Sequence, residues 1–87
     1  MGPTTKKVLS LIAAARQLER DVVVLNEATM RGIAVERDEA GQHRFVDPCG
    51  TVWTRSNRWI NDNGEWASQC DEAFFEAFSD ILRRNNR

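Results

Sequence analysis

The residues best suited to chemistry gather in one short segment, Trp53-Thr-Arg55-Ser-Asn-Arg58-Trp59. It carries two indoles and two guanidiniums within seven residues. Arginine stacks on aromatic faces and pairs bidentately with carboxylate or phosphate groups. Tryptophan and arginine are also enriched at the energetic centres of interfaces. We therefore predict that Trp53, Arg55, Arg58 and Trp59 contact a macromolecular partner. The alternative is that both tryptophans belong to the core and the arginines are their solvated neighbours.

A second candidate is the pair Phe75 and Leu82, which lie one heptad apart in a predicted helix. They fall at the edge of its apolar stripe, about 100° round the helix from Phe74. One interpretation is an exposed apolar strip that binds a partner helix or a second copy of the chain. The other is a broad helix face packed under a sheet. We include Phe75 and Leu82 among the predicted partner-binding residues, and the pattern allows a homodimer.

Groups for catalysis or metal binding are scattered. His43, Cys49 and Cys70 have no paired-ligand spacing of the Cys-x-x-Cys kind, so no metal site is predicted. Neither a nucleophile signature nor a glycine-rich phosphate loop is present in the sequence. We therefore expect no catalytic residue, no cofactor and no enzymatic activity, and we expect both cysteines to stay reduced.

The elements that position these residues begin with a predicted helix over 4–31. Its apolar residues step by three and four, which is helical spacing. The run Val22-Val23-Val24 is β-branched and suits a strand, so a strand over 21–26 is the alternative, although the long helix is favoured. Gly32 suits the C-terminal cap. We expect the stripe to form intramolecular core rather than a coiled coil. The stripe is Val8, Leu11, Ala15, Leu18, Val22 and Leu25.

After Gly32 the apolar pattern changes to a period of two, which predicts strands. Turn residues separate the strands at 39–42 and 47–50. A second helix follows Ser68, which we predict to be its N-cap. Asp71 stands where a capping box places an acid, and two arginines near the chain end suit the helix C-terminus. The predicted strands are 33–38, 43–47 and 51–55.

These elements predict a two-layer α+β fold, with a three-stranded antiparallel sheet flanked by an N-terminal and a C-terminal helix in the order αβββα. Residues 1–87 form a single small domain by this prediction, because 87 residues with 41% hydrophobic and 29% charged residues are typical of one globular core. The net charge of −1 argues against a uniformly basic nucleic-acid protein. The sequence contains no apolar run of about 18 residues, so we predict no membrane span. We expect a cytoplasmic protein.

Three segments carry a resemblance to a known family: Ala13-Ala-Ala-Arg-Gln-Leu18, Met30-Arg-Gly32 and Glu36–Phe45. Over about residues 11–48, the chain resembles the excisionase and MerR-like family of winged helix-turn-helix proteins. It implies a DNA-binding regulator. The chain departs from the family at Leu18-Glu-Arg-Asp, which lacks the usual glycine of the turn. The would-be recognition helix, 22–30, also carries no Lys or Arg for bases or phosphates.

The predicted element order also matches the double-stranded-RNA-binding domain. In that family lysines at the start of the last helix contact phosphates. Here Gln69, Asp71 and Glu72 stand at those positions, and the acids would repel a phosphate backbone. The phosphate-contacting lysines of this family are therefore absent from the matching positions of the sequence.

Taken together, the sequence predicts a small non-enzymatic binding protein that occupies the surface of a macromolecular partner. Inhibitors, adaptors and regulators of the kind carried by phages and plasmids are the class that we expect. The partner would be a protein or a protein–nucleic-acid complex, and direct nucleic-acid binding is the less favoured alternative. No membrane contact is expected.

Overall fold

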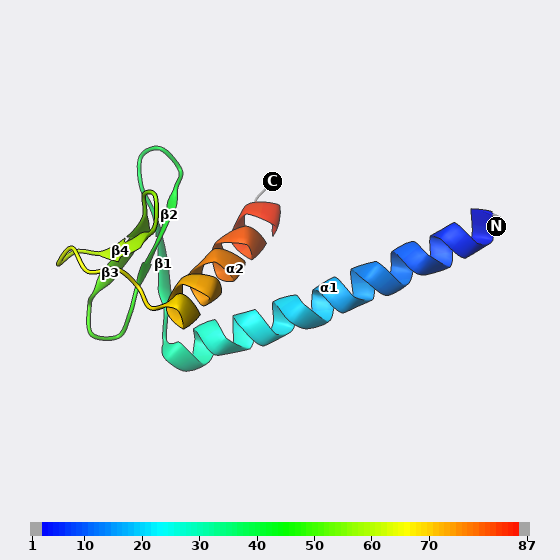
Figure 1. The fold of residues 1–87 in the computed structure, drawn as a ribbon, viewed down its shortest axis with the longest axis horizontal. Helices are drawn as coiled ribbons and strands as arrows, with labels where there is room; N and C mark the ends of the chain where they lie inside the picture. The colour runs from blue at the N-terminus through cyan, green and yellow to red at the C-terminus, as the bar shows by residue number, and fades with distance from the viewer. Residues whose placement is uncertain (1–2, 86–87) are drawn as a thin grey trace.

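The computed structural model describes residues 3–85, and the side chains of residues 7–85. A long helix leads into a sheet of four strands, and a second helix follows (Figure 1). This arrangement confirms the predicted α+β class. The elements are α1 (Pro3–Arg31), β1 (Ala34–Arg37), β2 (His43–Val46), β3 (Val52–Arg55), β4 (Trp59–Asn61) and α2 (Gln69–Asn85).

The sheet is an antiparallel meander with the strand order β1-β2-β3-β4. Val35 lies opposite Phe45, Phe45 lies opposite Trp53, and Trp53 lies opposite Asn61. Residues that lie directly opposite each other on antiparallel strands point to the same side, so these four residues share one face of the sheet. That face is the one that packs against α2.

The fourth strand was not predicted. β4 has three residues, which is too short for a visible alternation of apolar and polar side chains. The backbone N–H of Ser56 donates to the carbonyl of Arg58 at 3.1 Å, which closes a tight hairpin between β3 and β4. The N–H of Ala67 then donates to the carbonyl of Trp59 at 3.0 Å and holds the following loop against the strand.

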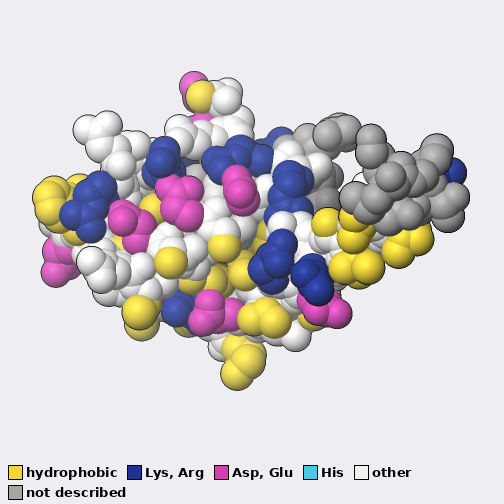
Figure 2. Space-filling model, turned by 45° about the vertical axis from the view of Figure 1, so that its right-hand side comes forward, with side chains coloured by type: hydrophobic (Ala, Val, Ile, Leu, Met, Phe, Trp, Pro, Cys, Tyr) yellow, Lys and Arg dark blue, Asp and Glu magenta, His cyan; other side chains and the backbone are white. Residues whose placement is uncertain are grey.

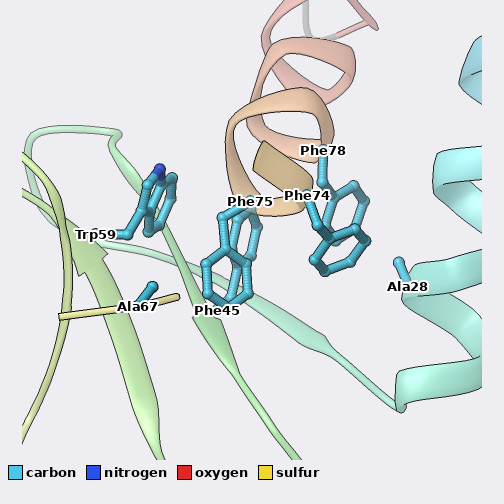
Figure 3. Packing of buried hydrophobic residues seen from close by; sticks show 7 residues of the cluster. All are labelled: Ala28, Phe45, Trp59, Ala67, Phe74, Phe75 and Phe78. Carbon is cyan, nitrogen blue, oxygen red and sulfur yellow. The ribbon is translucent and has the colours of Figure 1, made fainter. Parts of the chain in front are cut away.

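Helix α2 begins as predicted. The backbone N–H of Asp71 donates to Ser68 Oγ at 3.1 Å, so Ser68 caps the helix. The helix is buried on two sides, because the sheet lies on one and the end of α1 on the other. Phe75 points to the sheet, whereas Phe74 and Phe78 lie towards Ala28 of α1 (Figure 3). The buried cluster is Ala28, Phe45, Trp59, Ala67, Phe74, Phe75 and Phe78.

Helix α1 is continuous from Pro3 to Arg31, so the alternative of a strand over 21–26 is wrong. The β-branched valines are accommodated because Val24 packs against the core cluster in helical geometry. The helix also runs through the segment where a helix-turn-helix would turn. Gly32 ends it with a φ of +69°, and a Cβ there would lie 2.9 Å from Pro48 Cγ, so both conformation and space favour glycine.

Two ion pairs join α1 to α2. Arg84 donates to both carboxylate oxygens of Asp21 at 2.9 Å, and this hydrogen bonding lowers the pKa of Asp21 below its usual value. Arg31 donates to Asp71 at 2.9 Å and stacks over the Phe74 ring at 4.4 Å. Both contacts involve the C-terminal part of α1, so this part alone is anchored to the rest of the fold.

The N-terminal part of α1 projects away from the sheet and α2, and the molecule is 55 Å long as a result (Figure 1). Every residue from 7 to 20 is exposed. The prediction that the heptad stripe forms intramolecular core is therefore wrong. Its large side chains, from Val8 to Leu25, remain 39–69% exposed, and hydrophobic side chains gather on this arm in Figure 2.

Candidate functional site

The two tryptophans of the 53–59 segment belong to the core rather than to the surface. Trp59 is 1% exposed and stacks on Phe45, with ring centroids 5.2 Å apart. Trp53 is half-buried and packs on Phe75 at 5.4 Å, while its indole nitrogen donates to Asp47 at 3.4 Å. Their strand positions aim them at α2. The structure therefore corrects the expectation that Trp59 contacts a partner, whereas partner contact by the half-buried Trp53 stays a prediction.

The two arginines of the same segment do reach the surface. Arg55 pairs with Glu76, and Arg58 pairs with Glu72 at 3.4 Å. Glu72 also accepts a hydrogen bond from the backbone N–H of Trp59 at 3.2 Å. Both arginines therefore fasten the β3–β4 hairpin to α2, and their charges are balanced by carboxylates.

Phe75 and Leu82 do not form an exposed strip. Phe75 is 2% exposed and contacts the rings of Phe45, Trp53 and Trp59. Leu82 is half-buried and packs against the edge of the core cluster. The broad apolar face of α2 is explained by burial on two sides, so Phe75 is corrected from the surface to the core.

An exposed aromatic site that the sequence reasoning missed lies at the edge of the sheet. Trp66 is 65% exposed, and the guanidinium carbon of Arg58 lies 4.3 Å from its ring centroid. An antiparallel bridge pairs Trp66 with Ile60 of β4, which sets the indole beside the last strand. We call Arg58, Ile60 and Trp66 the tryptophan edge. The available signal was the position of Trp66 in a polar turn, directly after Asn61-Asp-Asn-Gly-Glu65.

Beneath the β1–β2 hairpin lies a small cavity of about 80 Å³. Trp59 lines this cavity, and its buried indole nitrogen has no hydrogen-bond partner among the described residues. His43 also borders the cavity, and its Nε2 accepts a hydrogen bond from Arg37 Nε at 3.4 Å. The lining residues are Gly41, Gln42, His43, Arg55, Trp59, Ser79 and Arg83.

His43 makes the stability of the fold depend on pH. Burial, and then the charges of Arg37 and Arg83, lower the pKa of His43 below its ordinary value of about 6.5. Below that pH the unfolded chain binds a proton that the folded chain resists, so stability falls as pH falls. We expect a lower free energy of unfolding at about pH 5 than at about pH 7.5, measured by urea denaturation.

The matched control is His43→Gln, which cannot titrate and should lose most of this pH dependence. The lower pH of this comparison stays above the range in which Asp21 is protonated, so the effects of His43 and Asp21 on stability can be separated. An equal pH dependence in wild type and His43→Gln would show that His43 is not its source.

Cys49 and Cys70 are both exposed and free. Within residues 3–85, no three His, Cys, Asp or Glu side chains come together as a metal site would require. Neither helix of that described part is both long and apolar enough to cross a membrane. Comparisons with protein families, with curated proteins and with solved structures found no match to this chain.

Proposed function

We propose that this chain is a small non-enzymatic binding protein, of the inhibitor, adaptor or regulator type, whose tryptophan edge docks on a partner protein. The observation that carries the proposal is the exposed Trp66 ring with the Arg58 guanidinium stacked on it at 4.3 Å. An indole buries a large apolar area with few rotatable bonds, and arginine adds directional hydrogen bonds. Such a pair is typical of an energetic centre of binding.

The charges of the molecule favour a protein partner over a nucleic acid. Phosphate binding relies on cations that are free to replace counterions. Six of the nine arginines within residues 7–85 are instead paired with carboxylates of the same chain, and the net charge is −1. We therefore expect a partner surface with an apolar hollow for the indole and hydrogen-bond acceptors around it. The pairs are Arg31–Asp71, Arg44–Glu36, Arg55–Glu76, Arg58–Glu72, Arg83–Asp80 and Arg84–Asp21.

The continuity of α1 bears on the DNA-binding alternative. A winged helix-turn-helix needs a turn near Leu18–Asp21 to set its second helix in the major groove, and α1 has none there. Over Pro3–Arg31 the chain therefore lacks the separate second helix with which an excisionase-like protein would contact DNA. Nucleic-acid binding is retained as an outcome of the test rather than as a second proposal.

The test is affinity capture from the source cell, followed by titration of the purified partner. Trp66→Ala should weaken binding by about 30-fold or more, since interface centres cost about 2 kcal/mol or more on truncation. Arg58→Ala should weaken it in the same direction. The thermal unfolding midpoint of Trp66→Ala should stay close to that of the wild type, because the indole is mostly exposed.

Two controls match the chemistry of these substitutions at other places. Arg44→Ala removes an arginine that is also paired on the sheet, and Met30→Ala removes a large apolar side chain that is 87% exposed on α1. Both should leave the affinity unchanged. Undiminished binding by Trp66→Ala would refute the proposed surface. A captured nucleic acid whose affinity falls steeply with salt would point to the nucleic-acid class instead.

A further inference from the structure

An exposed apolar stripe runs along α1, away from the tryptophan edge. Leu11 is 69% exposed and Leu18 is 64% exposed, on a part of the helix where every residue from 7 to 20 is exposed. A contiguous exposed apolar surface commonly marks a site of interaction with another molecule. We call the residues Val8, Leu11, Ala15, Leu18, Val22 and Leu25 the α1 stripe.

The α1 stripe does not face α2. The α1 residues that pack on or pair with α2 and the core are Asp21, Val24, Ala28 and Arg31. Because successive residues are separated by 100° around a helix, the stripe lies about a third of a turn from that face. Covering the stripe therefore requires another molecule, and α2 is positioned so that it leaves the stripe open.

We infer that a second copy of this chain covers the stripe, in a parallel two-stranded coiled coil of the two α1 helices. In heptad notation, Val8, Ala15 and Val22 occupy the a positions, and leucines occupy all three d positions from 11 to 25. Valine stands at two of these three a positions, and valine at a with leucine at d favours two parallel strands. An in-register pairing places each of these residues against its own counterpart.

The size of the stripe suits such an interface. From Val8 to Leu25 the helix extends about 27 Å at 1.5 Å per residue. The five large side chains of each copy would together remove roughly 1,000 Å² of apolar surface, which is where specific interfaces begin. The charges permit this pairing, because no like charges face each other at the flanking g and e positions. The facing pairs are Lys7 with Ile12, Ala14 with Glu19, and Asp21 with Asn26.

The rest of the fold is compatible with this two-fold arrangement. α2 packs along the flank of α1 that contains Asp21 and Ala28, both of which are g positions. A two-fold axis along the coiled coil puts the second copy's α2 on the opposite flank. Dimerisation also supplies the packing that the projecting part of α1 lacks, since most helical stability in proteins comes from packing of an apolar face.

The decisive measurement is sedimentation equilibrium of the full chain over a range of micromolar concentrations. The wild type should be a dimer. Leu18→Asp puts two carboxylates into one d layer and should raise the dimer dissociation constant by at least about 100-fold, or about 2.8 kcal/mol. Ala13→Asp is the matched control, because position f faces away from the stripe, and it should remain dimeric. Since Leu18 is exposed in the single chain, the sheet and α2 should stay folded in both variants.

The orientation is tested by a disulfide. In a Cys49→Ser, Cys70→Ser background, Leu11→Cys should cross-link two chains spontaneously, because parallel d positions lie side by side. An antiparallel pair would separate these positions and give no cross-link. A monomer, a trimer, a dimer that Leu18→Asp leaves intact, or an uncross-linked dimer would each overturn the inference. None of these results depends on the tryptophan edge, so the proposed function is tested independently.

Discussion

Replacing Trp59 with alanine is expected to lower the free energy of unfolding by about 3–5 kcal/mol. The side chain is 1% exposed, stacks on Phe45 and packs at a tilt on Phe75, each with ring centroids 5.2 Å away. Its removal leaves a cavity where β4 meets α2. The total stability of a native domain is only about 5–15 kcal/mol, so much of it would be lost. Urea denaturation followed by far-ultraviolet circular dichroism measures the change.

The matched control is the same substitution at Trp66, which is 65% exposed. Trp66→Ala should change stability by no more than about 0.5 kcal/mol, as exposed substitutions usually do. Trp59→Phe should cost less than Trp59→Ala, because it keeps a ring and removes a buried N–H that has no hydrogen-bond partner within residues 3–85. A greater loss of stability at Trp66 than at Trp59 would contradict the core described above.

The second large effect is expected at Phe45, which is fully buried. Its ring contacts those of Trp59, Phe75 and Phe78 at 4.9–5.6 Å, so it joins the sheet to α2. Phe45→Ala should lower the free energy of unfolding by about 3–5 kcal/mol. Phe45→Leu keeps most of the volume and should cost less than half as much, measured by the same denaturation.

Phe45 and Trp59 are in contact, so their substitutions should not be additive. We expect the milder pair, Phe45→Leu with Trp59→Phe, to differ from the sum of the single changes by about 0.5 kcal/mol or more. This pair keeps enough stability for an accurate measurement. Additive energies would show that the two rings do not act as one unit.

Local signals in the sequence were sufficient to predict most of the secondary structure. The spacing of three and four from Val8 to Leu25 predicted a helix, and its cap at Gly32 is confirmed. The Ser68 cap of α2 is confirmed in the same way. These signals work because hydrogen bonding at helix ends and the helical period depend on neighbouring residues only. A strand of three residues such as β4 lacks a comparable local signal.

Local signals could not predict which apolar residues are buried and which stay exposed. Periodicity shows that Leu11 and Leu18 share a face, but the same pattern suits a core and a coiled coil. Trp59 and Trp66 are the same residue type, and the hairpin register decides that one is buried and the other is exposed. Phe75 presented the same difficulty, because a helix edge becomes core when two layers enclose it. Each of these outcomes depends on contacts between distant segments.

The strand order of the meander has a consequence for the route by which the chain folds. Each strand of the sheet pairs with its neighbour along the chain, so these contacts close only short loops. The Asp21–Arg84 contact instead joins residues 63 positions apart. We therefore expect the hairpins and α2 to be already formed in the folding transition state, and α1 to pack against them afterwards. Weakening the Asp21–Arg84 contact would then accelerate unfolding and leave the refolding rate nearly unchanged.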